Sequence, residues 1–322
     1  MSLKRRRFFI LASISSLGLG GIWKIIQAQA AQELAPQAAV PSSLGKEGAM
    51  QVVPESGLNA IAALPTTPPI LRFISVADTG TGDRSQYAVA EAMARYRQQN
   101  PFEIALLAGD NIYTNGEFEK ISAVFEKPYQ ALLTQGVKFY ACLGNHDIRT
   151  ANGELQVKYS GFNMQGRYYT FRRGPVQFFA LDTNHNADWK NQLLWLEKEL
   201  SESDATWKVV FGHHQIYSSG IYGVNQPFIQ ALTPLFQRHG VQLYINGHEH
   251  HYERTRSIKG TTYLICGAGG GTRPVGRSEW TEYSASRLSF ATFDVYEDQM
   301  VVSGIGTDNQ VFDRGIIQLR SA

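Results

Sequence analysis

The sequence predicts an α/β fold in which two mixed β-sheets pack against each other and helices cover the outside. Three observations indicate this fold. In the first half of the body, short apolar runs alternate with helical patterns at the spacing of a parallel sheet. In the second half, further short apolar runs follow one another with one amphipathic helix among them. The 322 residues, 43% hydrophobic and 18% charged, exclude a disordered, collagen-like or coiled-coil chain.

Each element is expected from its own pattern. Helices are expected over 87–97, which is rich in Ala and Met, over 118–133, and over 189–200, where leucines recur at helical spacing. A hairpin is expected where residues 168–173 and 176–181 flank Gly174. The remaining strands are expected at 70–76, 102–108, 137–143, 207–211, 241–245, 262–266, 290–296 and 300–305.

The N-terminus has the order of a secretory signal peptide over residues 1–31. A basic group at Lys4–Arg7 precedes an apolar stretch, and small residues at Ala28–Ala31 resemble a processing site. The paired arginines followed by Phe8 resemble the twin-arginine signal, which carries folded proteins. The alternative is an uncleaved membrane anchor. The glycines, the serines and Lys24 of this stretch would make it a weak membrane-spanning helix.

Residues 32–69 are expected to form a linker, and one folded domain is expected over 70–322. The linker contains six of the chain's twelve prolines together with many Ala, Gln and Ser residues. Two cysteines exclude a disulfide-rich scaffold. Cys142 and Cys266 each lie in an apolar run and are interpreted as buried free thiols, with a bridge between them as the alternative after export.

The net charge of +2 is unevenly distributed along the chain. The first thirty residues contain five Lys and Arg and no acid, so the remainder has 25 basic (30 − 5) and 28 acidic side chains. Such a body has no general basic surface for nucleic acid. We therefore expect no nucleic-acid partner, and membrane contact only through an uncleaved leader.

Side chains of types that can bind metals follow five of the expected strands. In α/β sheets, ligands bind at the carboxyl ends of the strands, so these side chains are expected to meet at one point. Any single one of them could be an ordinary turn residue, but all five following apolar runs favour a shared site. The candidates are Asp78; Asp110 and Tyr113; Asn145 and His146; His213 and His214; and His248 and His250.

In these segments the chain resembles the calcineurin-like metallophosphoesterases, and more narrowly the purple acid phosphatases of the small, tartrate-resistant type. Tyr113 distinguishes this group from the wider superfamily. The resemblance implies a four-layer sandwich of two sheets between helices, and it runs from about Ile70 into the C-terminal strands. The matching motifs are Asp78-Thr79-Gly80, Gly109-Asp110-Asn111-Ile112-Tyr113, Gly144-Asn145-His146-Asp147, Val210-Phe211-Gly212-His213 and Gly247-His248-Glu249-His250.

The resemblance also implies roles for these residues. Fe(III) would be held by Asp78, Asp110, Tyr113 and His250, a hard donor set that suits this ion. Asp110 would bridge to a second divalent metal (Fe, Zn or Mn) that is completed by Asn145, His213 and His248. His146 would stabilise or protonate the leaving oxygen. His214 would contact substrate or, alternatively, hydrogen-bond to a metal ligand.

The chain departs from the family pattern after His213. Relatives often carry further histidines in a segment where this sequence has Ser218–Gly223, with Ile221 and Tyr222 at the histidine positions. A histidine acid from this loop is therefore not expected, which favours His146 in that role. Tyr222 is expected to alter the rim of the pocket.

The function implied is an exported, periplasmic or extracellular acid phosphatase with a binuclear metal site. It would hydrolyse small phosphomonoesters by attack of a metal-bound hydroxide. Two alternatives remain at this point: a phosphodiesterase or nucleotide hydrolase with the same metals, and an iron-binding redox protein. The sequence gives no indication of oligomeric state.

Overall fold

The computed structural model describes residue 65 and residues 67–319. The expected signal peptide and most of the expected linker lie outside the described residues. The described chain forms two sheets, one of six strands in the order β13-β12-β11-β1-β2-β3 and one of seven in the order β10-β8-β9-β7-β6-β5-β4. Both sheets mix parallel and antiparallel pairs, as the sequence predicts.

The six-stranded sheet contains the first three βα units of the chain. Strands β1, β2 and β3 are parallel and in register, so that Val76 lies beside Leu107 and Leu107 beside Ala141. Their carboxyl ends therefore meet at one edge of the sheet. The strands are β1 Leu71–Val76, β2 Ile104–Leu107, β3 Lys138–Ala141, β11 Ser289–Val295, β12 Gln299–Gly306 and β13 Val311–Gln318.

The seven-stranded sheet has a parallel centre of β5, β6, β7 and β9. Antiparallel strands β4, β8 and β10 complete it. The strands are β4 Tyr169–Arg173, β5 Val176–Ala180, β6 Trp207–Phe211, β7 Leu243–Asn246, β8 Tyr252–Thr255, β9 Thr262–Cys266 and β10 Thr281–Ala285.

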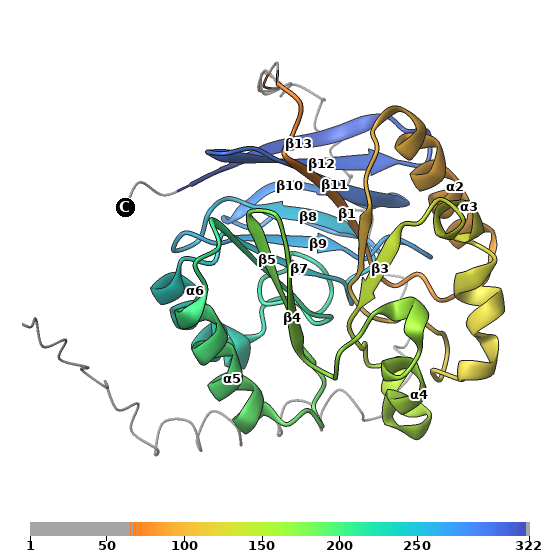
Figure 1. The fold of residues 1–322 in the computed structure, drawn as a ribbon, viewed down its shortest axis with the longest axis horizontal. Helices are drawn as coiled ribbons and strands as arrows, with labels where there is room; N and C mark the ends of the chain where they lie inside the picture. The colour runs from red at the N-terminus through yellow and green to blue at the C-terminus, as the bar shows by residue number, and fades with distance from the viewer. Residues whose placement is uncertain (1–64, 66, 320–322) are drawn as a thin grey trace, which may run out of the picture.

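Three hydrophobic clusters define four layers (Figure 1). The central cluster lies between the sheets and contains inward side chains of both, including Phe73, Phe178 and Phe293. A second cluster packs helix α2, Arg84–Gln99, and the short α3, Gln130–Leu133, against the six-stranded sheet. The third packs α5, Trp189–Glu202, and α6, Gln226–His239, against the seven-stranded sheet. The expected four-layer sandwich is thus confirmed.

The expectation of one continuous helix over 118–133 is wrong. The segment consists of short turns, because Pro128 lacks the N–H that a continuous helix would use there. Further short turns of helix follow β3. The short elements are Phe118–Lys120, Ser122–Glu126 and α3 in the first segment, and Asp147–Arg149, Ala151–Gly153, α4 Glu154–Val157 and Ser160–Phe162 in the second.

Three strands and one helix were not expected from the sequence: β8, β10, β13 and α6. Strands β8 and β13 contain charged residues that face inward, which hides their strand pattern. Arg254 of β8 donates to both carboxylate oxygens of the buried Asp313 of β13, at 2.7 and 2.8 Å. Because the pair satisfies both charges, the strands can bury residues that a hydrophobicity pattern would assign to a loop.

The two cysteines lie in the central cluster as free, fully buried thiols, which confirms that expectation. Helices of the length and apolarity required to cross a bilayer are not found in the described part of the chain.

Candidate metal centre

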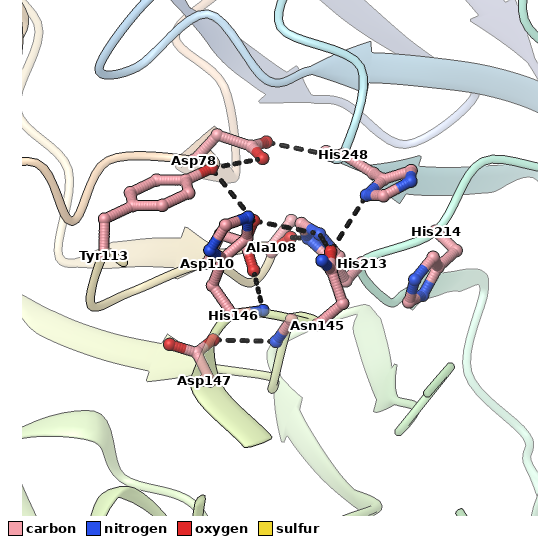
Figure 2. Close-up of polar contacts among 12 residues, drawn as sticks. Asp78, Ala108, Asp110, Tyr113, Asn145, His146, Asp147, His213, His214 and His248 are labelled. Carbon is pink, nitrogen blue, oxygen red and sulfur yellow. Dashed lines mark hydrogen bonds and ion pairs between the residues drawn. The ribbon is translucent and has the colours of Figure 1, made fainter. Parts of the chain in front are cut away.

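The predicted site residues come from the ends of five strands in both sheets, and the fold brings them together. Asp78 follows β1, Asp110 follows β2, Asn145 follows β3, His213 follows β6 and His248 follows β7. Figure 2 shows these side chains turned toward a common centre. The cluster therefore lies at the ends of the strands, where the sequence predicts it.

Tyr113 lies at the junction of one group of donors. Its hydroxyl oxygen is 3.0 Å from Oδ1 of Asp78, 2.9 Å from Oδ2 of Asp110 and 3.2 Å from Nε2 of His250 (Figure 2 draws the two carboxylate contacts). Nε2 of His250 is also 3.4 Å from Oδ1 of Asp78. The four residues expected to bind one metal therefore present their polar atoms to one point.

A second group forms around Asn145. Its Oδ1 lies 3.1 Å from Nε2 of His213 and 3.0 Å from Nδ1 of His248. Oδ2 of Asp110, which contacts Tyr113 in the first group, is also 3.5 Å from Nε2 of His213. Asp110 thus lies between the two groups, where a bridging carboxylate would be expected.

The backbone of three of these residues has the left-handed conformation, which non-glycine residues rarely adopt. The φ angles are 57° at Asp78, 54° at Asp110 and 69° at His248. Such angles cost on the order of 1 to 3 kcal/mol each and are typically found at functional sites. These turns follow the ends of the strands, where the side chains of the three residues face the common centre (Figure 2).

Two motif glycines allow the strand ends to approach each other closely. A Cβ atom on Gly144 would lie 2.1 Å from Oδ1 of Asp110, and one on Gly247 would lie 2.3 Å from Oδ2 of Asp78. Both distances are far below van der Waals contact, so only glycine fits beside these carboxylates. The glycines of the motifs are therefore required by packing around the site.

Asp147 connects two of the motifs, a role that the sequence analysis did not assign. The fully buried carboxylate accepts hydrogen bonds from the backbone N–H groups of Asn111, Ile112 and Gly144, at 2.7 to 3.1 Å. It also accepts from the side-chain amides of Asn111 and Gln156. Its position at the end of the third motif was the available signal. Asp147 fixes the loop carrying Asp110 against the loop carrying Asn145.

Electrostatics couple the members of the cluster. Burial, followed by the charges of Asp110 and Asp78, raises the pKa of Tyr113 well above its ordinary value. Burial also opposes ionisation of Asp110, but His213 and His146 lower the pKa of this carboxyl below its ordinary range. For His213, burial opposes the charged form, yet Asp110 and Asp78 raise its pKa to about 10. The carboxylates therefore attract positive charge to this centre.

The donor set suits hard metal ions. In the described chain, the buried Asp78 and Asp110 contact Tyr113, histidines and backbone N–H groups, with no Lys or Arg among their partners. Buried carboxylates are costly unless paired or bound to metal. Nε2 of His248 is likewise buried with no hydrogen-bond partner. Asp78, Asp110 and His213, and separately His213, His214 and His248, have ligand atoms within 4.8 Å of one another.

The cysteine thiols are not part of this centre. Burial raises the pKa of Cys142 well above its ordinary value and that of Cys266 to about 12, so both remain thiols. Sγ of Cys266 instead lies 3.3 Å from Oγ of Ser75, inside the core. The available donors are therefore carboxylate, phenol, amide and imidazole, the types that hard ions prefer.

The two predicted catalytic histidines have different surroundings. The backbone N–H of His146 donates to Oδ1 of Asp110, and its Nδ1 lies 2.6 Å from the carbonyl oxygen of Thr114. Its side chain is 20% exposed, and Nε2 is 3.9 Å from Oδ2 of Asp110. His214 is buried beside His213 and His248, with Nδ1 2.9 Å from the hydroxyl of Thr183. Its catalytic role stays a prediction.

Comparisons with known proteins identify the family of the chain. The family model described as calcineurin-like phosphoesterase matches residues 71–252. The chain is 31% identical over 230 residues to purple acid phosphatase 7 of Arabidopsis thaliana, which covers 62% of this chain and 70% of that protein. It is 27% identical over 239 residues to tartrate-resistant acid phosphatase type 5 of Oryctolagus cuniculus, covering 62% and 73%.

Solved structures support the fold. A purple acid phosphatase from seeds of yellow lupin, Lupinus luteus, superposes with a TM-score of 0.68 and 18% identity, over 79% of this chain and 55% of that chain. The family model covers more than half of the sequence and includes all five motifs. The chain therefore belongs to the calcineurin-like phosphoesterase family of hydrolases, in its purple acid phosphatase branch.

Proposed function

We propose that this protein is an acid phosphatase that hydrolyses small phosphomonoesters at a centre for Fe(III) and a second divalent ion, iron, zinc or manganese. When bound, the two metal ions would neutralise charge on the phosphate and lower the pKa of the water used as nucleophile. The proposed ligands are Asp78, Asp110, Tyr113 and His250 for Fe(III), and Asp110, Asn145, His213 and His248 for the second ion.

The position of Tyr113 carries this proposal. Its hydroxyl lies within 3.2 Å of three other candidate ligands, so it faces the centre and not solvent. A phenol with a raised pKa needs a strongly charged metal to ionise at working pH. Phenolate is a hard donor that favours Fe(III) over the softer divalent ions. The same side chain would distinguish this centre from a general phosphodiesterase site.

His146 is proposed to serve the leaving group. Because the Thr114 carbonyl can only accept, Nδ1 of His146 is the protonated nitrogen in this contact. Nε2 of the neutral ring then accepts from Nη2 of Arg149 at 3.5 Å, and it is the nitrogen that would take up a second proton and give it to the leaving oxygen. Its partial exposure allows a leaving alcohol to reach it. His214, paired with Thr183 and buried, is proposed to act by holding His213 and His248 in place.

Export is a further part of the proposal, supported by the signal-like order of residues 1–31. A twin-arginine route would allow the metal centre to be assembled before transport. Fusion of residues 1–31 to a reporter that is active only outside the cytoplasm tests this. Activity that survives Arg5→Lys combined with Arg6→Lys would exclude the twin-arginine route.

The experiment that tests the activity compares ester classes on the purified protein. We expect p-nitrophenyl phosphate to be hydrolysed with a higher kcat/KM than bis(p-nitrophenyl) phosphate. Cleavage of the diester at least as fast as the monoester would instead establish the phosphodiesterase alternative. Hydrolysis of neither ester by the metal-loaded protein would favour the redox alternative.

A further inference from the structure

Tyr222 and Arg273 form a wall on the His248 side of the centre. The ring of Tyr222 stacks on the imidazole of His248, with centroids 4.4 Å apart and planes 24° from parallel. The guanidinium carbon of Arg273 lies 5.6 Å from the centroid of the same Tyr222 ring. A cation therefore lies against an aromatic ring that itself covers a candidate metal ligand.

The loop that carries Tyr222 is fixed by hydrogen bonds to Glu249. Oε1 of this fully buried carboxylate accepts from the Tyr222 backbone N–H at 2.7 Å and from Oγ of Ser218 at 3.1 Å. Only glycine fits at position 220 of this loop, because a Cβ there would lie 2.6 Å from His251 and 2.8 Å from Glu249. The Tyr222 ring is thus held over His248 by the backbone of its own loop.

The segment that carries Arg273 is tied to the same framework. The Arg273 backbone N–H donates to the His250 carbonyl at 2.7 Å, and its Nη1 lies 3.4 Å from the His248 carbonyl. The Gly276 backbone N–H donates to the Ser219 carbonyl at 3.1 Å, joining the two rim segments. Both sides of the wall are therefore held in position before any substrate arrives.

The charge of Arg273 is not neutralised by the chain. Carboxylate partners are found for Arg72, Arg167 and Arg254, but none is found for Arg273 among the described residues. Its side chain is partly buried, so its guanidinium is less screened than one on an open surface. The planar guanidinium has five donors. Nη1 faces the His248 carbonyl oxygen at 3.4 Å, and the contact with the Tyr222 ring leaves the other in-plane donors available for an oxyanion.

We propose that Arg273, oriented by Tyr222, binds a second anionic group of the substrate, so that the enzyme prefers phosphomonoesters whose leaving group carries a carboxylate or another phosphate. This rests on the proposed phosphatase function and adds its substrate class. The transferred phosphate would lie at the metal centre, and the second oxyanion would take a bidentate contact from Arg273.

The test compares substrates with and without a second anionic group. Phenyl phosphate is the reference ester, and 4-carboxyphenyl phosphate is the matched ester with an added carboxylate. Pyrophosphate, a phosphoanhydride, adds a second phosphate, and these last two are the doubly anionic probes. The variants are Arg273→Gln, Arg273→Lys, Tyr222→Phe and Tyr222→Ala. Arg277→Gln is the matched control, because Arg277 is an exposed arginine of the same segment whose Nη2 donates to the Glu282 carbonyl.

In Arg273→Gln, kcat/KM for at least one doubly anionic probe should fall about tenfold to hundredfold, mainly because KM rises. This is the loss expected when one charge-assisted hydrogen-bond contact is removed. The value for phenyl phosphate should change less than about threefold. Tyr222→Phe keeps the ring and should behave as wild type, whereas Tyr222→Ala should reproduce part of the loss. Arg273→Lys should recover only part, since it lacks the planar fork.

Three results would overturn the inference. An equal loss on all three substrates in Arg273→Gln would assign Arg273 to the transferred phosphate or to structure. No loss on either doubly anionic probe, or the same loss in Arg277→Gln, would also reject it. Failure of the wild-type protein to hydrolyse phenyl phosphate is a different outcome, because it would reject the phosphatase function itself.

Discussion

Gly144→Ala tests whether the close approach of the motif loops is needed for the centre. The new Cβ would lie 2.1 Å from Oδ1 of Asp110 and 2.3 Å from the Asp110 backbone nitrogen, whereas ordinary contact begins near 3.4 Å. Since the backbone conformation of Gly144 is not left-handed, alanine adds a steric effect without backbone strain. About 1 Å of displacement must be shared between Asp110 and the loop that carries Asn145.

The magnitude follows from that displacement. A misplacement of about 1 Å can reduce the rate on the order of 100-fold, and overpacking costs about 1 to 3 kcal/mol of stability. For a domain of this size, that cost lowers Tm by about 2 to 12 °C. We therefore expect kcat/KM for p-nitrophenyl phosphate to fall at least about 100-fold, together with metal content, in a protein that still folds.

The assay pairs kinetics with metal analysis, circular dichroism and thermal unfolding. Gly136→Ala is the control, because Gly136 has no atom within 4 Å of its added Cβ and its φ of +81° gives a purely backbone cost. This control should keep full specific activity. If Gly144→Ala retains its metals and activity within about threefold of wild type, the reasoning that these loops must touch is wrong.

Three further predictions concern the surroundings of the site. Asp147→Ala leaves three buried backbone N–H groups without their acceptor, so the free energy of unfolding measured with urea should fall by about 3 kcal/mol or more. An unchanged midpoint of urea unfolding would contradict the role of Asp147 in holding the two loops together. Burial raises the pKa of Cys142 well above its ordinary value and that of Cys266 to about 12. Neither thiol should therefore react with a disulfide reagent at pH 8 in the native protein, whereas both should react in denaturant. Rapid reaction of the native protein would show that the core is open. Removal of metals by a chelator with reductant should abolish hydrolysis and lower Tm, with recovery on adding back iron and zinc; full activity after removal would exclude a metal-dependent reaction.

The positions of most strands and the place where the motifs meet were predictable from the sequence, because each depends on local signals. The order of the strands within each sheet depends on long-range pairing and was not predicted. The apolar runs β1, β2, β3, β6 and β7 each end directly before a motif, and parallel strands bring such ends together. Strands β8 and β13 were not predictable, because the Arg254–Asp313 pair becomes compatible with burial only when both strands are in place. Pro128 within the 118–133 segment is itself a local signal that a continuous helix ends there.

The ligand candidates could be named from motifs, whereas the residues that hold them could not. Asp147 acts through backbone N–H groups of another loop, so no spacing in the sequence shows what it binds. Tyr222 stands at a position where relatives often have a histidine, but its contact with Arg273 joins residues about fifty positions apart. Such contacts depend on tertiary packing of irregular loops, which local periodicity does not encode.

The central claim is that Tyr113 and its neighbours bind a ferric ion beside a second metal. The most direct measurement is the visible absorption spectrum of the purified protein together with its iron, zinc and manganese content, for wild type and for Tyr113→Phe. The account predicts about two metals per chain, at least one of them iron, and a broad tyrosinate-to-iron band that disappears in Tyr113→Phe. A colourless wild-type protein with two non-iron metals, or a band that persists in Tyr113→Phe, would contradict it.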